Sequence, residues 1–449
     1  MTQIKRESFS GNFTTFFATL SAAVGLGNIW RFPYVIGENG GAAFLLIYFA
    51  CVFLIGFPIL IAEFIIGRSG QGNVVAAYEK IGGPRWKFAG FMAIASSMLI
   101  AFFYTSVTGW TYYYLYKSLT RTLVIENPTA AHEVFTTFVN NPTSNILWQW
   151  IAIAVAAGVI CLGVRKGIER LTKFSMPLLF ILMILCMTQS LSLPNSWAGV
   201  EFLFKVDFSK VSQESWLTAL GLAFFKISLG TGAMLTYSSY FKSEVNLVQS
   251  AGQIVIADTL ISILAGLVIF PAVFSFGIDP SSGPGLLFET IPLVFDKMPF
   301  GGVLTTVFFF LAASAATSVT IALFEPFTSY LIGNWGLSRK KATLFVVGLN
   351  VFFGAFAALS PTPNSLLGDF HLFGKTFFNL FDFMSSNLLM PLGGLFCALI
   401  VGWRVSSDLI KKELTNDGYL RLGHFFSIYM TIIRYVTPIL VAVVFFNAF

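Results

Sequence analysis

Apolar runs of about 20 residues recur from one end of this 449-residue chain to the other, and each is long enough to cross a lipid bilayer as a helix. Hydrophobic residues make up 56% of the sequence and charged residues only 11%, whereas about a quarter of the residues of a soluble domain are charged. The chain therefore lacks the charged surface that a soluble protein needs. These runs predict an all-α integral membrane protein.

Eleven transmembrane helices are predicted, with boundaries good to a few residues. Their ranges are 13–37, 41–67, 88–118, 146–163, 168–191, 215–241, 247–277, 301–332, 341–359, 377–404 and 423–447. Lys5 and Arg6 lead into a first span that is too long and too rich in glycine for a cleaved signal peptide, so this span is expected to be retained.

Lysine and arginine are concentrated in alternate loops, for example at 165–173, 339–341 and 404–421. The positive-inside rule places these loops and the N-terminus in the cytoplasm. With an odd number of spans, the C-terminus is then expected outside. The net charge of +6 follows from this topology, so no nucleic-acid partner is predicted.

The cysteines and histidines give no sign of a metal centre or an enzyme. The cysteines, all inside apolar runs and without metal-ligand spacing, are Cys51, Cys161, Cys186 and Cys397. The histidines, all at or near loops, are His132, His371 and His424. No nucleophile has an evident base, so we expect neither an enzyme nor a bound cofactor.

Two of the predicted spans are interrupted by glycine. Gly25-Leu26-Gly27-Asn28 lies in the middle of the first span, and the sixth contains the run Ser228–Gly232. Free backbone groups survive at membrane depth only where they line a cavity or bind a ligand. The two spans are five apart, which predicts two inverted repeats of five helices, each opened by a broken helix. Close helix packing is the alternative explanation for either glycine run alone.

The predicted divisions of the chain follow from these repeats. Residues 1–191 form the first repeat with spans 1–5, residues 192–404 form the second repeat with spans 6–10, and residues 405–449 hold span 11.

The run Gly25–Tyr34, with the sequence Gly-Leu-Gly-Asn-Ile-Trp-Arg-Phe-Pro-Tyr, resembles the first-helix signature of the neurotransmitter:sodium symporter family. The similarity covers nearly the whole chain and includes 38–44, Ala62-Glu63-Phe64, Gly67-Arg68, Gly109-Trp110-Thr111, Gly167-Ile168-Glu169, Met176-Pro177, 270–274 and 387–394. The resemblance implies a five-plus-five inverted repeat, alternating access, and an amino acid or amine moved with sodium. Eleven spans are a pattern of bacterial members, so the inner membrane of a bacterial cell is expected, with the chain a monomer or weak dimer in the lipid bilayer.

The resemblance also implies a substrate site between the two broken helices, where both charged ends of an amino acid need polar partners. The substrate-binding residues carried over are Ala23, Gly25, Ile100, Tyr104, Phe225, Lys226, Ser228, Thr231, Val319 and Leu323. The carboxylate is expected at the Gly25 backbone and the Tyr104 hydroxyl, although the local sequence of Tyr104 alone would favour ordinary packing. Thr231 stands where a leucine-transporting member has phenylalanine, so the pocket is expected to accept a larger hydrophobic side chain.

The implied first sodium site contains the most informative departure from the family. Its residues are Ala23, Asn28, Lys226 and Asp258. The lysine replaces a serine or threonine, and an ammonium at this depth costs several kcal/mol unless it is paired, with Asp258 as the expected partner. Our hypothesis is that Lys226 supplies the volume and charge of the first sodium ion. A purely structural ion pair and a lysine that carries a proton across are the alternatives.

The implied second sodium site is also changed. Its residues are Ser21, Val24, Ala315 and Ser318. A gapless alignment puts Val319 at its second hydroxyl position, and an isopropyl group offers sodium no oxygen. A shift of one residue would instead restore Thr317 and Ser318, so whether sodium binds here stays open.

The implied gates are Arg31 and Asp382 on the outside and Arg6 and Tyr240 on the inside. The usual acidic partner of the inner gate falls at Gly333, which is not acidic. The inner gate is therefore expected to be looser or to be partnered through another residue such as Glu325.

The predicted function is secondary active transport of hydrophobic amino acids. With both sodium sites changed, transport that is independent of sodium or coupled to protons is favoured. The alternatives are a conventional sodium-coupled symporter and a channel or receptor-like protein on the same fold, although no filter-like sequence of a channel is present. The sequence does not identify the amino acid, the coupling ion or its stoichiometry.

Overall fold

A computed structural model of the chain describes residues 12–123, 125–163, 170–281, 283–360, 367–421 and 424–446, and this part is helical, with no β-strand. The helices of the first half are α1 (Asn12–Ala23), η1 (Gly27–Arg31), α2 (Phe32–Glu38), α3 (Ala42–Cys51), η2 (Val52–Gly56), α4 (Phe57–Gly70), α5 (Val74–Gly82), η3 (Pro84–Trp86), α6 (Lys87–Leu119), α7 (Pro128–Val139), α8 (Pro142–Cys161), α9 (Arg170–Leu191), α10 (Ser196–Phe204) and η5 (Phe208–Lys210). Those of the second half are α11 (Gln213–Lys226), α12 (Ala233–Ser238), α13 (Leu247–Phe276), η6 (Gly283–Gly285), α14 (Leu286–Asp296), α15 (Gly301–Trp335), α16 (Arg339–Leu359), α17 (Phe377–Asp382), η7 (Phe383–Leu389), α18 (Met390–Trp403), α19 (Ser407–Thr415), α20 (Phe425–Thr431), η8 (Ile432–Val436) and α21 (Thr437–Phe446).

Within the described ranges, eight helical runs are long and apolar enough to cross a bilayer, or up to nine if the bent pair of α9 and α10 forms one span. The predicted spans 13–37 and 215–241 are not among them, because each is divided into shorter helices. The prediction of an all-α membrane protein is confirmed, whereas the total of eleven spans stays a prediction.

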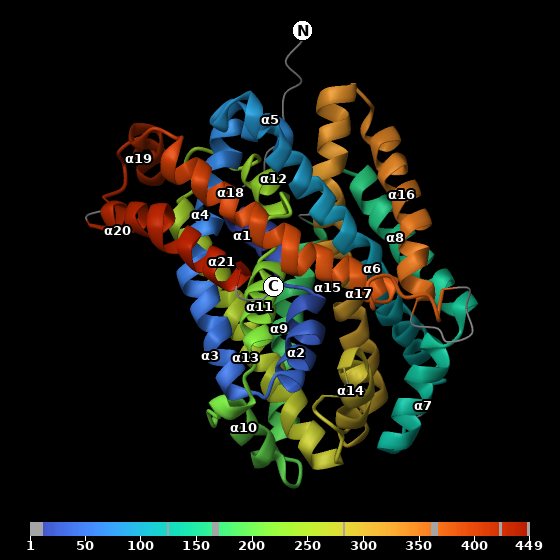
Figure 1. Ribbon diagram of the computed structural model, residues 1–449. Coiled ribbons are helices and arrows are strands. Elements are labelled where there is room, and N and C mark those ends of the chain that lie inside the picture. Colours follow the sequence, from blue (N-terminus) through green and yellow to red (C-terminus); the bar gives the residue numbers. More distant parts are fainter. Residues whose placement is uncertain are drawn as a thin grey trace.

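The centre of the molecule is built around α15. This helix packs along α6, and both α6 and α16 pack against α8 (Figure 1). In the most apolar stretch of α15, 89% of the residues are buried. In the corresponding stretch of the C-terminal run Phe425–Phe446, the share is 28%. The central helix therefore packs against protein on all sides, and the C-terminal run lies at the periphery.

The first interruption separates α1 from η1 at Val24 and Gly25, where the chain bends. The Gly25 N–H donates to Asn28 Oδ1 at 3.3 Å, so a side chain takes the place of a helical backbone partner. This interruption faces the second one across the middle of the protein.

The second interruption, which we name the 227–232 turn, separates α11 from α12. Ser228, Gly230 and Gly232 have φ angles of 53°, 71° and 73°, so the right-handed helix cannot continue past Lys226. Gly230 lies so close to the Met390 backbone that a side chain would not fit there. The turn thereby leaves backbone N–H and C=O groups free to bind other parts of the molecule.

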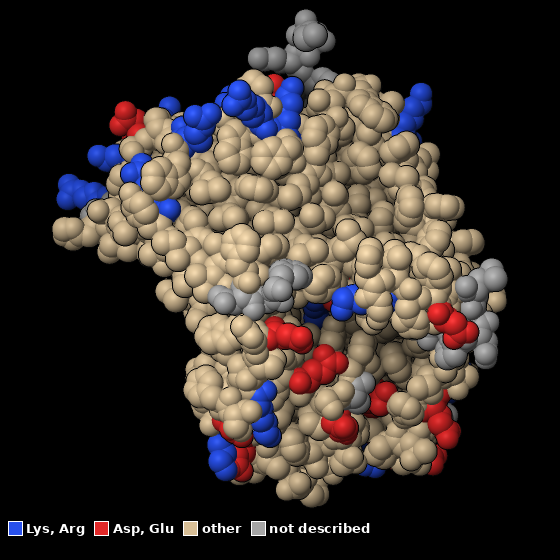
Figure 2. All heavy atoms as spheres, in the orientation of Figure 1, with Lys and Arg blue, Asp and Glu red and all other residues tan. Residues whose placement is uncertain are grey.

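Charged residues are distributed unevenly over the surface. In Figure 2, lysines and arginines gather at the end that carries α5 and α19, and most of the acidic side chains in view lie toward the other end. This asymmetry agrees with the alternation of basic charge between the loops of the sequence.

Candidate functional site

A small cavity lies between the two interruptions, α6 and α15. It is lined by Ala23, Gly27, Ile100, Tyr104, Phe225, Ser228, Thr231, Val319 and Leu323. Its free volume is about 10 Å³, close to the space of one water molecule. An amino acid can enter only if the residues around the cavity move apart.

Most of the predicted substrate residues line this cavity, and Gly25 and Lys226 do not. Gly25 lies just behind the wall, where a methyl group of Val319 packs against it and the Tyr104 hydroxyl is close by. The Lys226 side chain passes Gly27 and leaves the cavity for a neighbouring polar cluster. Any effect of Lys226 on a substrate therefore acts through the wall of the cavity.

Polar groups in the cavity wall are already engaged with one another. The Tyr104 hydroxyl accepts the Leu26 N–H at 3.2 Å, so this hydroxyl is bound to the backbone of the first interruption. The Thr231 hydroxyl donates to the Ser228 carbonyl at 2.7 Å within the 227–232 turn. Because that bond uses the Thr231 hydroxyl locally, the residue is best suited to offer its methyl group to an apolar ligand.

Lys226 is the centre of a fully buried polar cluster. Its Nζ donates to the Tyr48 hydroxyl at 2.7 Å and to Ser262 Oγ, and lies 3.0 Å from Asp258 Oδ2. Three acceptors match the three N–H groups of an ammonium. The rings of Phe32 and Tyr48 lie 4.5 and 4.7 Å from Nζ and present their electron-rich faces to the charge. We call Lys226, Asp258, Tyr48 and Ser262 the Lys226 cluster.

Asn28 connects the Lys226 cluster to the first interruption. Its Nδ2 donates to Asp258 Oδ1 at 2.6 Å and to Ser262 Oγ at 3.0 Å, while its Oδ1 accepts the Gly25 N–H. Three of the predicted residues of the first ion site, Asn28, Lys226 and Asp258, are thus brought together, and Ala23 lies nearby in the cavity wall. The Asp258 carboxylate binds the Lys226 and Asn28 side chains, and Asn28 Oδ1 binds the Gly25 N–H.

The predicted second ion site has one hydroxyl and one valine at its two predicted hydroxyl positions. Ser318 Oγ donates to the Ser314 carbonyl at 2.9 Å. Val319 faces Gly25 and the cavity. Thr317 instead hydrogen-bonds to the Tyr112 hydroxyl of α6 at 2.8 Å. This arrangement favours the gapless alignment, because the valine rather than a hydroxyl faces the first interruption.

The predicted outer gate is an ion pair above the cavity. Arg31 Nη2 lies 2.8 Å from Asp382 Oδ1, and Nη1 donates to Ser386 Oγ at 3.0 Å. Ser386 in turn donates to Asp382 at 2.8 Å, a contact that the sequence did not predict. The Arg31 guanidinium also lies 4.1 Å from the centre of the Phe225 ring, so the pair rests on a residue of the cavity wall.

The predicted inner gate is only partly described, because Arg6 lies outside the described residues. The Tyr240 hydroxyl donates to Glu325 Oε1 at 2.9 Å, which is the alternative partner that the sequence suggested. Arg339 binds both oxygens of Glu325 at 2.9–3.2 Å. Sequence reasoning missed Arg339, because it begins α16 among other basic loop residues and nothing local marks it as the partner of an acid on α15.

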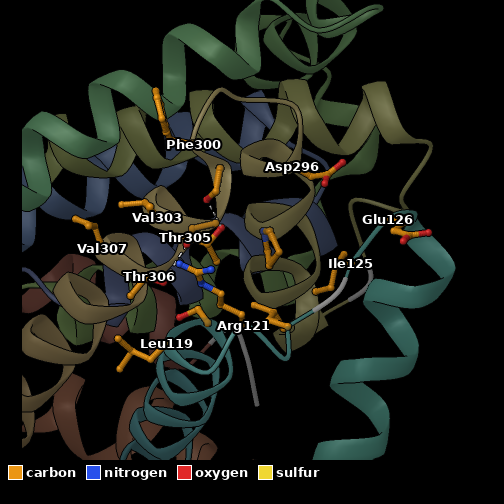
Figure 3. A pocket seen from close by; sticks show the side chains of 15 residues that line it. Leu119, Arg121, Ile125, Glu126, Asp296, Phe300, Val303, Thr305, Thr306 and Val307 are labelled. Carbon is orange, nitrogen blue, oxygen red and sulfur yellow. Dashed lines mark hydrogen bonds between the residues drawn. The ribbon is translucent and has the colours of Figure 1, made fainter.

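A second hollow, of about 680 Å³, lies far from the predicted site residues. It is formed by the end of α6, the segment that follows it, α14 and the start of α15 (Figure 3). Its charged lining residues are Arg121, Glu126 and Asp296, of mixed sign. None of the residues carried over from the family lies there, so the small cavity remains the candidate substrate site.

Comparisons with known proteins agree with this geometry. The model of the sodium:neurotransmitter symporter family matches residues 6–146 and 140–449. An uncharacterized sodium-dependent transporter, YhdH, of Bacillus subtilis is 38% identical over 96% of this chain and 95% of its own length. An uncharacterized sodium-dependent transporter of Haemophilus influenzae is 33% identical over 99% of this chain and 98% of its own. A crystal structure of MhsT in complex with L-phenylalanine superimposes with a TM-score of 0.95 at 37% identity, covering 99% of this chain and 100% of the other.

Proposed function

Because the chain belongs to the sodium:neurotransmitter symporter family, we propose that it carries hydrophobic amino acids across the membrane by alternating access. The family is one of symporters rather than enzymes. The apolar lining of the cavity, from Ile100, Phe225, Val319 and Leu323, suits a hydrophobic side chain. The similarity to MhsT, whose structure holds L-phenylalanine, supports the same class of substrate.

Within this proposal, the Lys226 ammonium takes the place of the first sodium ion. The observation that carries the idea is the complete set of partners around Nζ: Asp258, Tyr48 and Ser262 use all three of its N–H groups. Asn28 and Asp258, which would otherwise offer oxygens to a metal, are bonded to each other. The fixed charge acts on the substrate carboxylate indirectly, by holding Asn28 and through it the backbone at Gly25.

We also propose that the second sodium site is weakened and that a proton drives transport. Val319 supplies no oxygen where the family has a hydroxyl, so Ser318 is left as the one hydroxyl of the predicted pair. The names of the relatives, which are sodium-dependent transporters, favour the alternative of a conventional sodium-coupled symporter. The two functions differ in a measurable way, because only the conventional symporter needs sodium to accumulate its substrate.

The proposed setting is a bacterial inner membrane, with the N-terminus in the cytoplasm and the C-terminus outside. The gathering of lysines and arginines at the α5 and α19 end supports this orientation, because basic loops face the cytoplasm (Figure 2). The proposed repeats are 1–191 and 192–404, followed by 405–449.

The test is uptake of radiolabelled L-phenylalanine into proteoliposomes, with sodium and pH gradients imposed separately. We expect saturable uptake with counterflow, equal rates in sodium and choline buffers, and accumulation when the lumen is alkaline. Counterflow would exclude a channel, since a channel does not exchange solutes in this way. Accumulation only in a sodium gradient would overturn sodium independence and leave the conventional symporter.

A further inference from the structure

Glu63 on α4 is a buried carboxyl group that belongs to neither the proposed substrate site nor the proposed ion sites. Its exposed fraction is 1%. No lysine, arginine or histidine of the described chain forms an ion pair with it, in contrast to Asp258 and Asp382. An unpaired carboxylate inside a membrane protein costs several kcal/mol, so such a group is expected to be neutral or functional. The motif Ala62-Glu63-Phe64 was noted in the sequence only as part of the family resemblance.

The contacts of the carboxyl group come from the interrupted sixth span. The Gly230 N–H donates to Glu63 Oε1 at 2.7 Å, and the Leu235 N–H at the start of α12 also faces the carboxyl group. Oε2 is buried and has no hydrogen-bond partner within the described chain. A carboxylate would leave a charged oxygen at Oε2 without a donor, so the neutral, protonated acid is favoured at this position.

The other titratable groups around Glu63 do not supply a counter-charge. Tyr78 of α5 and Cys397 of α18 lie within range of its charge, and both are buried. Arg68, further along α4, binds Glu413 and the Val245 carbonyl instead. The proton on Glu63 is therefore controlled by its backbone partners rather than by a fixed ion pair.

Those backbone partners belong to a segment that also forms part of the cavity wall. Ser228 and Thr231 line the small cavity, and Gly230 between them binds Glu63 on the opposite side of the 227–232 turn. Since the cavity holds only about 10 Å³, a substrate must move parts of its wall, and this turn is one of those parts. Any shift changes the environment of the carboxyl group and hence its affinity for a proton. By linkage, protonation of the group must then change the affinity for the substrate to the same extent.

We propose that Glu63 is the proton-binding site that couples transport to a pH gradient, with the 227–232 turn as the connection to the substrate. The inference rests on the proposed proton-driven transport. The protonated acid favours the closed, occupied cavity, in which the turn is dry. When the cavity opens to the cytoplasm and the substrate leaves, water reaches the turn and the proton is released. One proton then moves inward with each substrate molecule, and no bond other than the O–H bond at Glu63 forms or breaks.

The test compares the variant Glu63→Gln with the wild type and with the control Glu289→Gln, a mostly buried glutamate on α14 at the outer loops. We expect Glu63→Gln to keep L-phenylalanine counterflow within about threefold of the wild type, because exchange needs no net proton movement. Accumulation driven by an alkaline lumen should fall at least about tenfold, the loss that corresponds to about 1.4 kcal/mol of coupling. Glu289→Gln should keep both activities. Wild-type accumulation by Glu63→Gln would overturn the proposal and leave Lys226 as the rival proton carrier.

A second measurement covers the case in which Glu63→Gln does not fold. The affinity of the wild type and of Glu63→Asp for L-phenylalanine is measured from pH 5.5 to 8.5 by changes in intrinsic tryptophan fluorescence. We expect the wild type to bind more tightly as pH falls and Glu63→Asp to show the same dependence with a displaced midpoint. An affinity that is independent of pH in the wild type, or the same midpoint in both, would overturn the proposal. If the wild type shows neither counterflow nor uptake, the proposed function itself fails, which is a different result.

Discussion

The two predicted ion sites beside the cavity differ from the family in different ways. The first has a lysine in place of a hydroxyl, and the second has a valine in place of a hydroxyl. In the first site, the Lys226 ammonium is surrounded by acceptors and by two aromatic rings, and in our proposal it keeps a positive charge there. In the second site, Val319 contributes methyl groups, and in our proposal no charge takes the place of an ion. The proposal therefore contains two different changes at two sites beside one cavity. A fixed charge needs a complete set of partners, whereas an absent charge needs only apolar packing.

The substitution Asp258→Asn should have the largest effect, because it removes the counter-charge of a fully buried ammonium. Loss of one partner of such a pair costs about 3–5 kcal/mol of stability, so the melting temperature should fall and transport should be largely lost. The melting temperature of the purified protein and L-phenylalanine uptake measure the two effects. Asp296→Asn, on a half-exposed aspartate, is the control and should leave both unchanged. An unchanged melting temperature for Asp258→Asn would show that this carboxylate does not hold the ammonium.

The substitution Lys226→Thr should convert the first site into one that needs a mobile cation. The hydroxyl and the vacated volume beside Asn28 and Asp258 restore the family pattern, so we expect uptake in sodium to exceed uptake in choline about tenfold, a coupling of about 1.4 kcal/mol. Lys226→Met, which removes the charge without adding an oxygen, is the control and should gain no response to sodium. If uptake by the wild type depended on sodium as strongly as uptake by the variant, Lys226 would not be a replacement for the first sodium ion.

The substitution Ser262→Ala should weaken the Lys226 cluster by a smaller amount. It removes one acceptor of the ammonium and one acceptor of Asn28 while the ion pair remains. A buried donor left without a partner costs about 1–3 kcal/mol, so the melting temperature should fall by less than for Asp258→Asn. Ser275→Ala on the same helix is the control. An effect as large as that of Asp258→Asn would mean that hydrogen bonding rather than charge dominates the cluster.

The substitution Val319→Ser should have the smallest effect, because one hydroxyl restores only part of the second site. We expect sodium to stimulate uptake by about threefold, a gain of less than 1 kcal/mol. Val319→Ala enlarges the cavity in nearly the same way without an oxygen, so it should show no stimulation. If sodium stimulated uptake by the two variants equally, the second site would differ from that of the family by more than this hydroxyl.

Much of the fold could be predicted from the sequence, because hydrophobic length and glycine interruptions are local signals. The ends of α6, α13 and α16 fall within two residues of the predicted spans. The glycine-rich run Ser228–Gly232 also predicts that the sixth span is interrupted, but only the backbone angles at Ser228 and Gly230 show where α11 ends.

The candidate site was less predictable where it depends on contacts between distant residues. Lys226 and Asp258 stood out because each is charged inside an apolar run. Arg339 and Ser386 did not, since their partners Glu325 and Arg31 lie on other helices and neither residue is unusual in its local sequence. The small volume of the cavity was also unexpected. It depends on how closely the helices approach one another, and the expectation that Thr231 lets the pocket accept a larger hydrophobic side chain stays a prediction.

The permanence of the Lys226 ammonium has a thermodynamic consequence for the proposed transporter. A charge that belongs to the chain returns with it in every cycle, so it does no net work in the electric field across the membrane. Each sodium ion that is replaced in this way removes about 2.3 kcal/mol of driving force per 100 mV, which is about a 50-fold difference in the attainable concentration ratio. Such a carrier would keep only the driving force of the proposed proton and in return would operate where sodium is scarce.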